Sequence, residues 1–296
     1  MVHKCYDPIV SEPQKYFYSF CLFVLNRLPF STTEVALFLP TLIVLTLLAY
    51  RIRFLAASGA ISASLVGLLV YYGGGLRWFG TLVFFFVISS LLTKYKYSEK
   101  RNMSIVQEKG GARGWANVLA NGGFASFFAL NELAYGGDFY TAAFLGAIST
   151  AFADTLGTEV GLLSKNEPRS IIPPFRRLAR GQSGAVSGLG LLAGFFGALS
   201  LGILTVFLGL LNQNSVLIIL IVLAGGVAGG ILDSFLGSTV QGSGECVVCG
   251  KRTETLVHHD KPTKHIKGIR FFENNVVNLI STGFGAAVSL ALFLFI

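Results

Sequence analysis

Residues 149–161 read Ser-Thr-Ala-Phe-Ala-Asp-Thr-Leu-Gly-Thr-Glu-Val-Gly and lie near the end of a long apolar stretch. Two carboxylates, Asp154 and Glu159, therefore fall in a segment otherwise suited to lipid. An ionised carboxylate at the centre of a bilayer costs about 2.5–3.5 kcal/mol on insertion scales, so such residues normally face a bundle interior, a partner charge or a water-filled cavity. The stretch predicts a membrane helix with a polar site near one end.

The spacing of the polar residues limits what this helix can do. Thr150, Asp154 and Thr158 share one stripe at helical spacing, and Glu159 lies on a neighbouring stripe. The two carboxylates are about 140° apart around an ideal helix and could not chelate one ion from it. Either Gly157 permits local unwinding or the two acids have separate roles. A packing network inside the bundle is the alternative to a functional site.

The composition is that of a polytopic membrane protein, with 53% hydrophobic residues and a mean hydropathy of +0.65. A spanning helix needs about 20 mostly apolar residues. We therefore expect an all-α membrane bundle of about eight transmembrane helices, with residues 1–33 as an interfacial segment and 34–296 as one transmembrane domain. The expected spans are 34–53, 56–73, 77–93, 115–135, 140–163, 184–209, 215–240 and 275–296.

Charge placement supports eight spans. Nineteen of the 23 basic residues follow the first, third, fifth and seventh spans, which puts them on one side of the membrane. The positive-inside rule assigns that side to the cytoplasm, or to the stroma of a plastid. The net charge of +8 is thus mainly a topology signal. A nucleic-acid-binding face needs basic residues with interleaved aromatics, and these loops do not show that pattern, so we expect no nucleic-acid partner.

Further polar clusters lie toward this basic side. Glycine-rich turns precede the spans 115–135 and 184–209, and such turns expose backbone N–H groups that suit anions, although they also serve as plain topology determinants. Ser183 is expected to cap the second of these helices. Packing residues would be scattered in depth, whereas a site for a soluble anion would not, so we favour a site. Its candidate residues are Lys109, Gly110, Gly111, Arg113, Asn117, Asn121, Asp154, Glu159, Arg177, Arg180, Ser183, Asp233, Asn274, Asn275 and Asn278.

Small residues at spacing four recur in the later spans, as in Gly225 with Gly229 and Gly226 with Gly230. In lipid this pattern lets helix backbones approach closely. It predicts a tight bundle and indicates no chemistry.

Cys246 and Cys249 form a Cys-x2-Cys pair that is followed by His258, His259 and His265. This combination could hold zinc. The separation from Cys249 to His258 is shorter than in a zinc finger and there is one Cys pair, which favours ordinary loop thiols.

Several motifs, in the same order from about residue 35 to 296, resemble the phytyl-phosphate kinases. That membrane family has animal, archaeal and bacterial relatives and is related to the polyprenol and phytol kinases. The matching stretches are 110–114 with 117–122, 153–161, 184–187, 233–237 and 274–278, and residues 249–259 resemble the plastid and cyanobacterial branch.

The resemblance implies transfer of a phosphoryl group from a nucleoside triphosphate, CTP in the phytyl branch, to a prenyl monophosphate. The diphosphate product feeds tocopherol (vitamin E) synthesis from recycled phytol in that branch. Such a transfer needs positioning and charge neutralisation between two polyanions. Mg²⁺ binds through one or two carboxylates plus phosphates, so we expect Asp154 and Glu159 to hold it, with Asp233 as a third ligand or as a hydrogen-bond acceptor behind the ligands.

The remaining roles follow from the same implied chemistry. The basic residues would hold the phosphates, the asparagines would orient ligands, and the lipid chain would lie between small-residue helices. A plastid envelope or thylakoid and a bacterial inner membrane are both expected locations. Other nucleotides and a homo-oligomer stay open. The alternatives are a prenol or phytol kinase, a cytidylyltransferase acting on a membrane lipid, and a secondary transporter.

Overall fold

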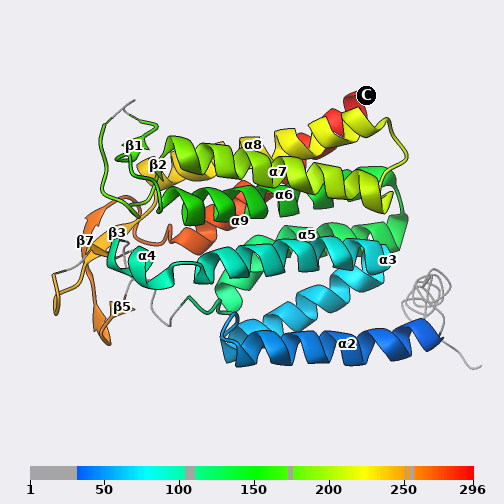
Figure 1. Cartoon of the computed structure of the whole chain (residues 1–296), viewed down its shortest axis with the longest axis horizontal. Coiled ribbons are helices and arrows are strands. Elements are labelled where there is room, and N and C mark those ends of the chain that lie inside the picture. The colour runs from blue at the N-terminus through cyan, green and yellow to red at the C-terminus, as the bar shows by residue number, and fades with distance from the viewer. Residues whose placement is uncertain (1–31, 104–110, 173–175, 251, 254–256) are drawn as a thin grey trace, which may run out of the picture.

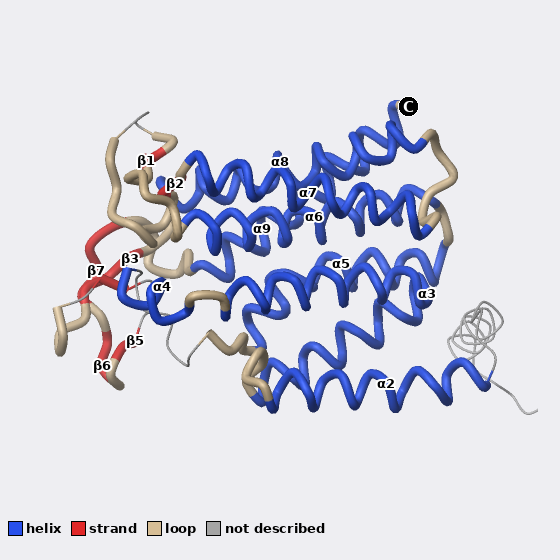
Figure 2. The backbone as a smooth tube through the Cα atoms, in the orientation of Figure 1, coloured by secondary structure: helices blue, strands red, loops and turns tan. Residues whose placement is uncertain are grey.

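The computed structural model describes residues 32–103, 111–172, 176–250, 252–253 and 257–296. Within these residues the chain is a bundle of long helices with short strands gathered at one end (Figures 1 and 2). The expected interfacial segment falls almost wholly outside the described residues and stays a prediction. The helices are α2 (Thr32–Arg51), α3 (Ala57–Lys94), α4 (Tyr97–Met103), α5 (Trp115–Tyr135), α6 (Asp138–Gly161), α7 (Gly188–Leu208), α8 (Ser215–Thr239) and α9 (Asn274–Phe295).

Five of the described helices, α2, α3, α7, α8 and α9, are long and apolar enough to cross a membrane. Helices α5 and α6 have 21 and 24 residues and carry many of the polar side chains discussed above. The helical bundle is therefore confirmed, and the count of eight crossings stays a prediction.

Helix α3 joins two of the expected spans, 56–73 and 77–93, in one element of 38 residues. Gly75, with φ 74° and ψ −167°, interrupts it, and the chain reverses direction there (Figure 1). This backbone conformation is open to glycine and strained for other residues. The break lies inside the expected connection between the two spans. Just beyond it, the ring of Trp78 stacks on Phe144 of α6 at 4.2 Å between centroids.

Helix α6 forms the centre of the bundle. Every residue from Thr141 to Ala153 is buried, and the helix packs against α5, α7, α8 and α9. A Cβ atom added at Gly229 would overlap the side chain of Thr150, whose hydroxyl donates a hydrogen bond of 3.1 Å to the carbonyl oxygen of Gly225. The glycines spaced four apart on α8 thus provide the close helix contact that their pattern predicts.

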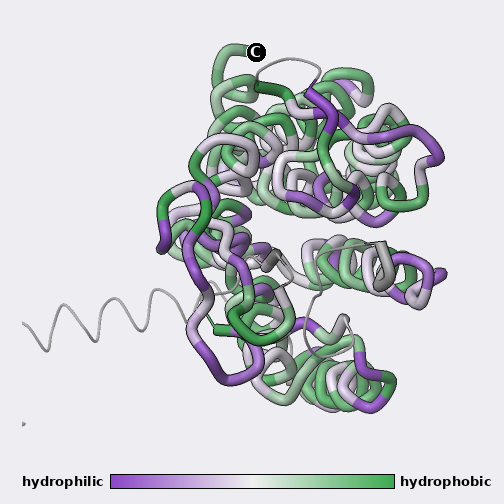
Figure 3. Tube along the Cα trace, turned by 90° about the vertical axis from the view of Figure 1, so that its left-hand side faces the viewer, coloured by the Kyte–Doolittle hydropathy of each residue, from purple (hydrophilic) through white to green (hydrophobic). Residues whose placement is uncertain are grey.

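The connections at one end of the bundle contain short antiparallel strands that the sequence pattern did not predict. Figure 3 shows that the segments at this end are the more hydrophilic part of the chain. Strands β1 (Arg169–Ser170) and β2 (Ala185–Val186) pair between α6 and α7. The α8–α9 connection contains a sheet with the order β4 (Arg252–Thr253), β3 (Ser243–Glu245), β7 (Lys264–Lys267), and a hairpin of β5 (Val257–His258) with β6 (Lys261–Pro262).

The pairing of β1 with β2 corrects one prediction. Helix α7 begins at Gly188, four residues after the expected start at 184, because residues 185–186 are used in β2. Ser187 caps the helix, and its hydroxyl oxygen accepts a hydrogen bond of 3.1 Å from the Gly190 amide. The expected N-cap role of Ser183 is therefore wrong.

Candidate functional site

A cavity of about 1070 Å³ lies between the helices and reaches the end that bears the strands. It exceeds the usual range of small-molecule sites, about 300–1000 Å³. Its walls change character along the cavity. Leu42 and Leu45 of α2, with Val66, Phe79 and Phe86 of α3, provide apolar lining, whereas α5, α6, α8 and α9 provide acids and amides.

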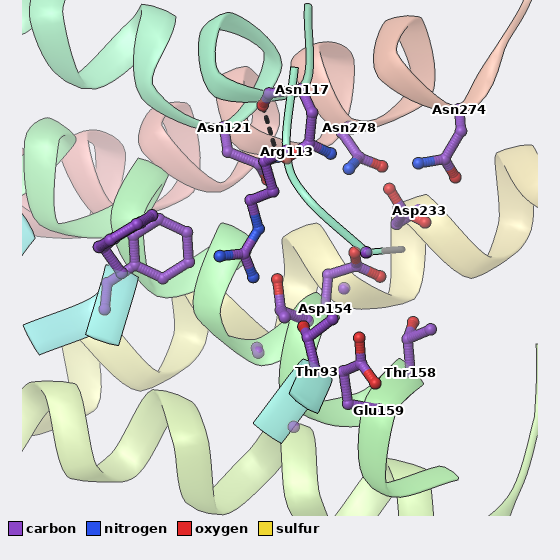
Figure 4. Close-up of a pocket in the computed structure, with 18 of the residues that line it drawn as sticks. Thr93, Arg113, Asn117, Asn121, Asp154, Thr158, Glu159, Asp233, Asn274 and Asn278 are labelled. Carbon is purple, nitrogen blue, oxygen red and sulfur yellow. Dashed lines mark hydrogen bonds between the residues drawn. The ribbon is translucent and has the colours of Figure 1, made fainter. Parts of the chain in front are cut away.

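The predicted site residues that line the cavity come from five separate regions of the chain. Figure 4 shows several of them directed into one space. They are Gly111, Arg113, Asn117, Asn121, Asp154, Glu159, Arg180, Ser183, Asp233, Asn274, Asn275 and Asn278.

Two aspartates lie next to each other in the lining of the cavity. The side chains of Asp154 on α6 and Asp233 on α8 are close enough to share a hydrogen bond. The Asn278 amide on α9, with its nitrogen turned toward its acceptors, donates to Asp233 Oδ2 (3.1 Å) and to the Asn274 carbonyl oxygen (3.0 Å). Two ionised carboxylates repel each other, so this arrangement requires a shared proton or a cation between them. Carboxylate oxygens are the donors that Mg²⁺ prefers, and the pair therefore fits that ion.

Glu159 is placed differently from the two aspartates. Its Oε2 atom lies 2.5 Å from Nζ of Lys100 on α4, in an ion pair whose side chains are 14% and 4% exposed. Lys100 also donates to the carbonyl oxygen of Leu92. Helix α6 is continuous through Gly157, so the unwinding that would bring both acids of α6 to one ion is absent from this described helix. Of the two possibilities left by the spacing, the structure favours separate roles.

Arg113 supplies the positive charge opposite the acids. Its backbone is fixed between the amide of Ala56 and the carbonyl oxygen of Phe54, and its Nη1 donates to the hydroxyl of Ser90. The guanidinium lies over the ring of Phe86, 5.8 Å from the centroid. Burial lowers the pKa of Arg113 to about 10, while the charge of Glu159 acts in the opposite direction. The side chain therefore remains protonated at neutral pH.

The turn that carries Arg113 is packed without spare room against α3. A Cβ atom at Gly59 would overlap the Arg113 carbonyl oxygen. Gly111, at φ 76°, allows the chain to bend just before the arginine. The predicted glycine-rich turn thus orients a cation here, and its other expected members, Lys109 and Gly110, lie outside the described residues.

One side-chain amide oxygen on α5, in a residue that lines the cavity, is buried and has no partner among the described residues. Asn121 Nδ2 donates to the Asn117 backbone carbonyl at 2.9 Å. Asn117 Oδ1 is buried and has no hydrogen-bond partner within the described part of the chain. A buried carbonyl oxygen without a partner costs about 1–3 kcal/mol, so this atom is suited to accept from a ligand.

The second basic loop reaches the cavity through Arg180, Gln182 and Ser183. A Cβ atom at Gly184 would overlap the backbone of Ser238, which places this turn directly against the end of α8. Arg177, by contrast, is not part of the lining and forms an exposed ion pair with Glu167 at 3.0 Å.

Thr93, Lys100 and Gln241 also line the cavity and were not among the candidates. Lys100 counted in the sequence only as one of several loop cations. Its position six residues beyond an apolar span could have singled it out, but its partner is 59 residues away in the chain.

Comparisons with known proteins agree with this architecture. Residues 40–286 match a family described as "Integral membrane protein DUF92". The chain is 31% identical to Protein PGR of Arabidopsis thaliana over 256 residues, which cover 79% of this chain and 87% of that protein.

Two other relatives extend the comparison. The chain is 31% identical to the Uncharacterized membrane protein MJ0933 of Methanocaldococcus jannaschii over 214 residues, 72% of this chain and 86% of that protein. It is 25% identical to Protein VTE6, chloroplastic, of Arabidopsis thaliana over 248 residues, 82% of this chain and 66% of that protein.

No solved structure matches the chain. The family expected from the motifs is confirmed by the match over residues 40–286. The chain belongs to the DUF92 family of multi-pass integral membrane proteins.

Proposed function

We propose that this protein is a phosphotransferase that converts a prenyl monophosphate, phytyl phosphate in the first instance, to the diphosphate with CTP as donor. The observation that carries the proposal is a single cavity in which opposed carboxylates and a buried arginine adjoin apolar walls. An amphiphile with a phosphate head and a long chain matches both parts. The motif resemblance to the phytyl-phosphate kinases supports the same substrate class.

The reaction needs no strong base, because the acceptor phosphate is already anionic near neutral pH. An acceptor oxygen forms a bond to the γ-phosphorus of CTP, the bond from that phosphorus to the β-bridging oxygen breaks, and CDP leaves. Catalysis then consists of bringing two polyanions together and stabilising the charge that develops. Arg113 would bind phosphate oxygens through the N–H groups that Ser90 does not use.

The aspartates supply the other half of the site. Asp154 and Asp233 would hold Mg²⁺, which when bound neutralises charge on the donor phosphates. Asn278 fixes the orientation of Asp233 through its amide. Glu159, which is paired with Lys100, would hold that lysine and the adjacent acids in position. Its contribution to binding of the ion would be less direct than that of the two aspartates. Asn117 Oδ1 would accept a hydrogen bond from the bound nucleotide.

The lipid chain would lie along Leu42, Val66 and Phe79, with its phosphate toward the basic loops. By the positive-inside rule, we place this end of the bundle in the cytoplasm or in the stroma. The membrane would be a bacterial inner membrane or a plastid envelope or thylakoid.

The test is phosphorylation of phytyl monophosphate by the purified full chain with CTP and Mg²⁺, with products identified by mass spectrometry. Asp154→Asn should lower the turnover rate by at least about a hundredfold, the loss that is typical when a main electrostatic group of an active site is removed. Asp138→Asn, on the same helix at its other end and exposed, should keep wild-type activity.

The products separate the rival functions. A monophosphate formed from the free alcohol indicates a prenol kinase, and a CDP adduct indicates a cytidylyltransferase. Uptake of a solute into proteoliposomes without nucleotide indicates a transporter. Absence of product with every nucleotide and prenyl phosphate, or full activity in Asp154→Asn, would refute the proposal.

A further inference from the structure

A second group of ligand atoms lies in the α8–α9 connection, outside the cavity lining. Cys246 Sγ is 3.5 Å from Nδ1 of His259, and Cys249 Sγ is 3.8 Å from Nδ1 of His258. One donor atom from each of the four residues lies within 4.8 Å of all the others. Cys246 and His258 are buried, whereas Cys249 and His259 are exposed. The cluster is therefore anchored in the fold on one side and open to solvent on the other.

These distances match a tetrahedral metal centre. With zinc–sulfur bonds of about 2.3 Å and zinc–nitrogen bonds of about 2.0–2.1 Å, tetrahedral angles place sulfur and nitrogen ligands about 3.6 Å apart. The two sulfur–nitrogen distances lie on either side of that value. Two thiols and two imidazoles are also a common donor set of structural zinc.

The backbone around the first cysteine is shaped to support a thiolate. The Val248 amide donates to Cys246 Sγ at 3.3 Å, and the Gly250 amide donates to the Cys246 carbonyl oxygen at 2.9 Å. Gly250, at φ 68°, closes this tight turn in a conformation that favours glycine. The turn therefore orients Cys246 and Cys249 before any metal binds.

The histidines are presented by a second tight turn. His258 pairs with Lys261 at the end of the β5–β6 hairpin. The two residues between them, His259 and Asp260, have φ values of 53° and 58°. Two successive residues at positive φ form a hairpin turn usually made by Asn-Gly or Gly-Gly, so the hairpin carries strain that ligation would offset. The conformation brings both imidazoles to the cysteines, which ordinary loop thiols would not require.

We propose that Cys246, Cys249, His258 and His259 bind one zinc ion in a closed, structural site. All four positions are filled by protein donors, so the site leaves no coordination position for a substrate. The two thiols release their protons to solvent as the ion binds. This inference is independent of the proposed phosphotransfer.

The site would stabilise the rim of the cavity. Cys246 follows β3 directly. The base of the α8–α9 connection is closed by hydrogen bonds from the Gly242 amide to the Phe272 carbonyl oxygen and from the Ile269 amide to the Val240 carbonyl oxygen, both 2.8 Å, and Lys267 of β7 donates to the Ser238 carbonyl oxygen of α8. Gln241, at the same base, lines the cavity. Zinc would thus hold the solvent-facing part of the α8–α9 connection in place, while the base of the same connection borders the cavity.

The experiment measures the metal content of the full chain. The protein is purified in detergent, without chelators, by means of an affinity tag that contains no histidine. Elemental mass spectrometry should find about one zinc per chain. Cys246→Ser/Cys249→Ser and His258→Ala/His259→Ala should each lose it. Two matched controls should retain it: Cys5→Ser/Cys21→Ser, which removes the other two cysteines of the chain, and His265→Ala, an exposed histidine on β7.

A second measurement needs no variant and covers the case in which the ligand variants fail to fold. Wild-type protein stripped of metal by a chelator should take up one equivalent of Co²⁺, with the thiolate-to-cobalt absorption of a tetrahedral site, and Zn²⁺ should abolish that absorption. Absence of zinc together with absence of stoichiometric cobalt binding would overturn the proposal. So would a Cys246–Cys249 disulfide in the protein as isolated, or zinc that persists in the folded cysteine variant.

Discussion

The ion pair between Lys100 and Glu159 offers a direct test of how the polar end is held together. Its two side chains are 4% and 14% exposed, so water screens the pair little. At an effective dielectric constant of about 20, unit charges 4 Å apart attract by about 4 kcal/mol. Replacing Lys100 with Met removes this attraction and leaves the Glu159 carboxylate without its ion-pair partner, with only the weaker interaction with Arg113. Removal of one partner of a buried pair costs about 3–5 kcal/mol, which is the loss of unfolding free energy we expect.

The assay is unfolding by sodium dodecyl sulfate in mixed micelles, followed through tryptophan fluorescence in a Trp115→Phe background, so that the signal comes from Trp78, which is buried against Phe144. Glu159→Gln should show a similar loss, because it leaves the lysine unpaired. The double variant should recover much of it, since neither charge then remains alone. Lys96→Met is the matched control. Its pair with Glu99, at 3.3 Å, is about half exposed and should contribute about 0.2–1 kcal/mol.

Two results would refute this reasoning. The first is a Lys100→Met variant that is no less stable than Lys96→Met. The second is a double variant that loses the sum of both single losses, since that would show that the two charges act independently.

Two further predictions concern packing. Gly59→Ala should lower the free energy of unfolding by about 1–3 kcal/mol and reduce phosphotransfer, because the added methyl group displaces the turn that carries Arg113. Gly80→Ala, where the methyl group meets open space, is the control and should leave activity unchanged. Thermal unfolding and the kinase assay test both variants, and a Gly59→Ala variant with wild-type stability and activity would contradict the placement of that turn. Thr150→Val removes the hydrogen bond to the Gly225 carbonyl oxygen and should lower the free energy of unfolding by about 0.6 kcal/mol, and by at most about 1.7 kcal/mol, as measured for hydrogen bonds between membrane helices. The detergent unfolding assay measures this loss, and a gain in stability would contradict the contribution of that bond.

The sequence predicts the bundle well because lipid imposes a simple rule on it. An apolar stretch of the right length must be a helix, and the expected span 115–135 coincides with α5. The predicted start of α7 is wrong because residues 185–186 pair with β1, a strand that lies about 16 residues earlier in the chain. Periodicity within one segment carries no information about such pairing. The strands of the α8–α9 connection were not predicted for the same reason, because they also pair with segments outside their own.

The candidate site divides along a similar line. Residue types and their depth were enough to name Asp154, Arg113 and Asp233, which line one cavity. The pairing of Glu159 with Lys100 could not be derived, since it depends on where α4 lies relative to the end of α6. Arg177 and Arg180 are three residues apart in one basic loop, yet one lies in the solvent and the other at the cavity. Charge alone does not distinguish them.

The position of α6 explains why this helix, which carries Asp154 and Glu159, is not among the five that length and hydropathy detect. In the five strongly apolar helices only 17–39% of the most apolar window is buried, as expected of helices with one side toward lipid. Helix α6 is enclosed by its neighbours, and protein contacts replace lipid along its length. A helix in that position can carry carboxylates, because partner charges and amides from α4, α5, α8 and α9 surround them. The carboxylates of α6 are thus tolerated because protein, and not lipid, surrounds that helix, which is the environment in which ionisable side chains inside a membrane are normally found.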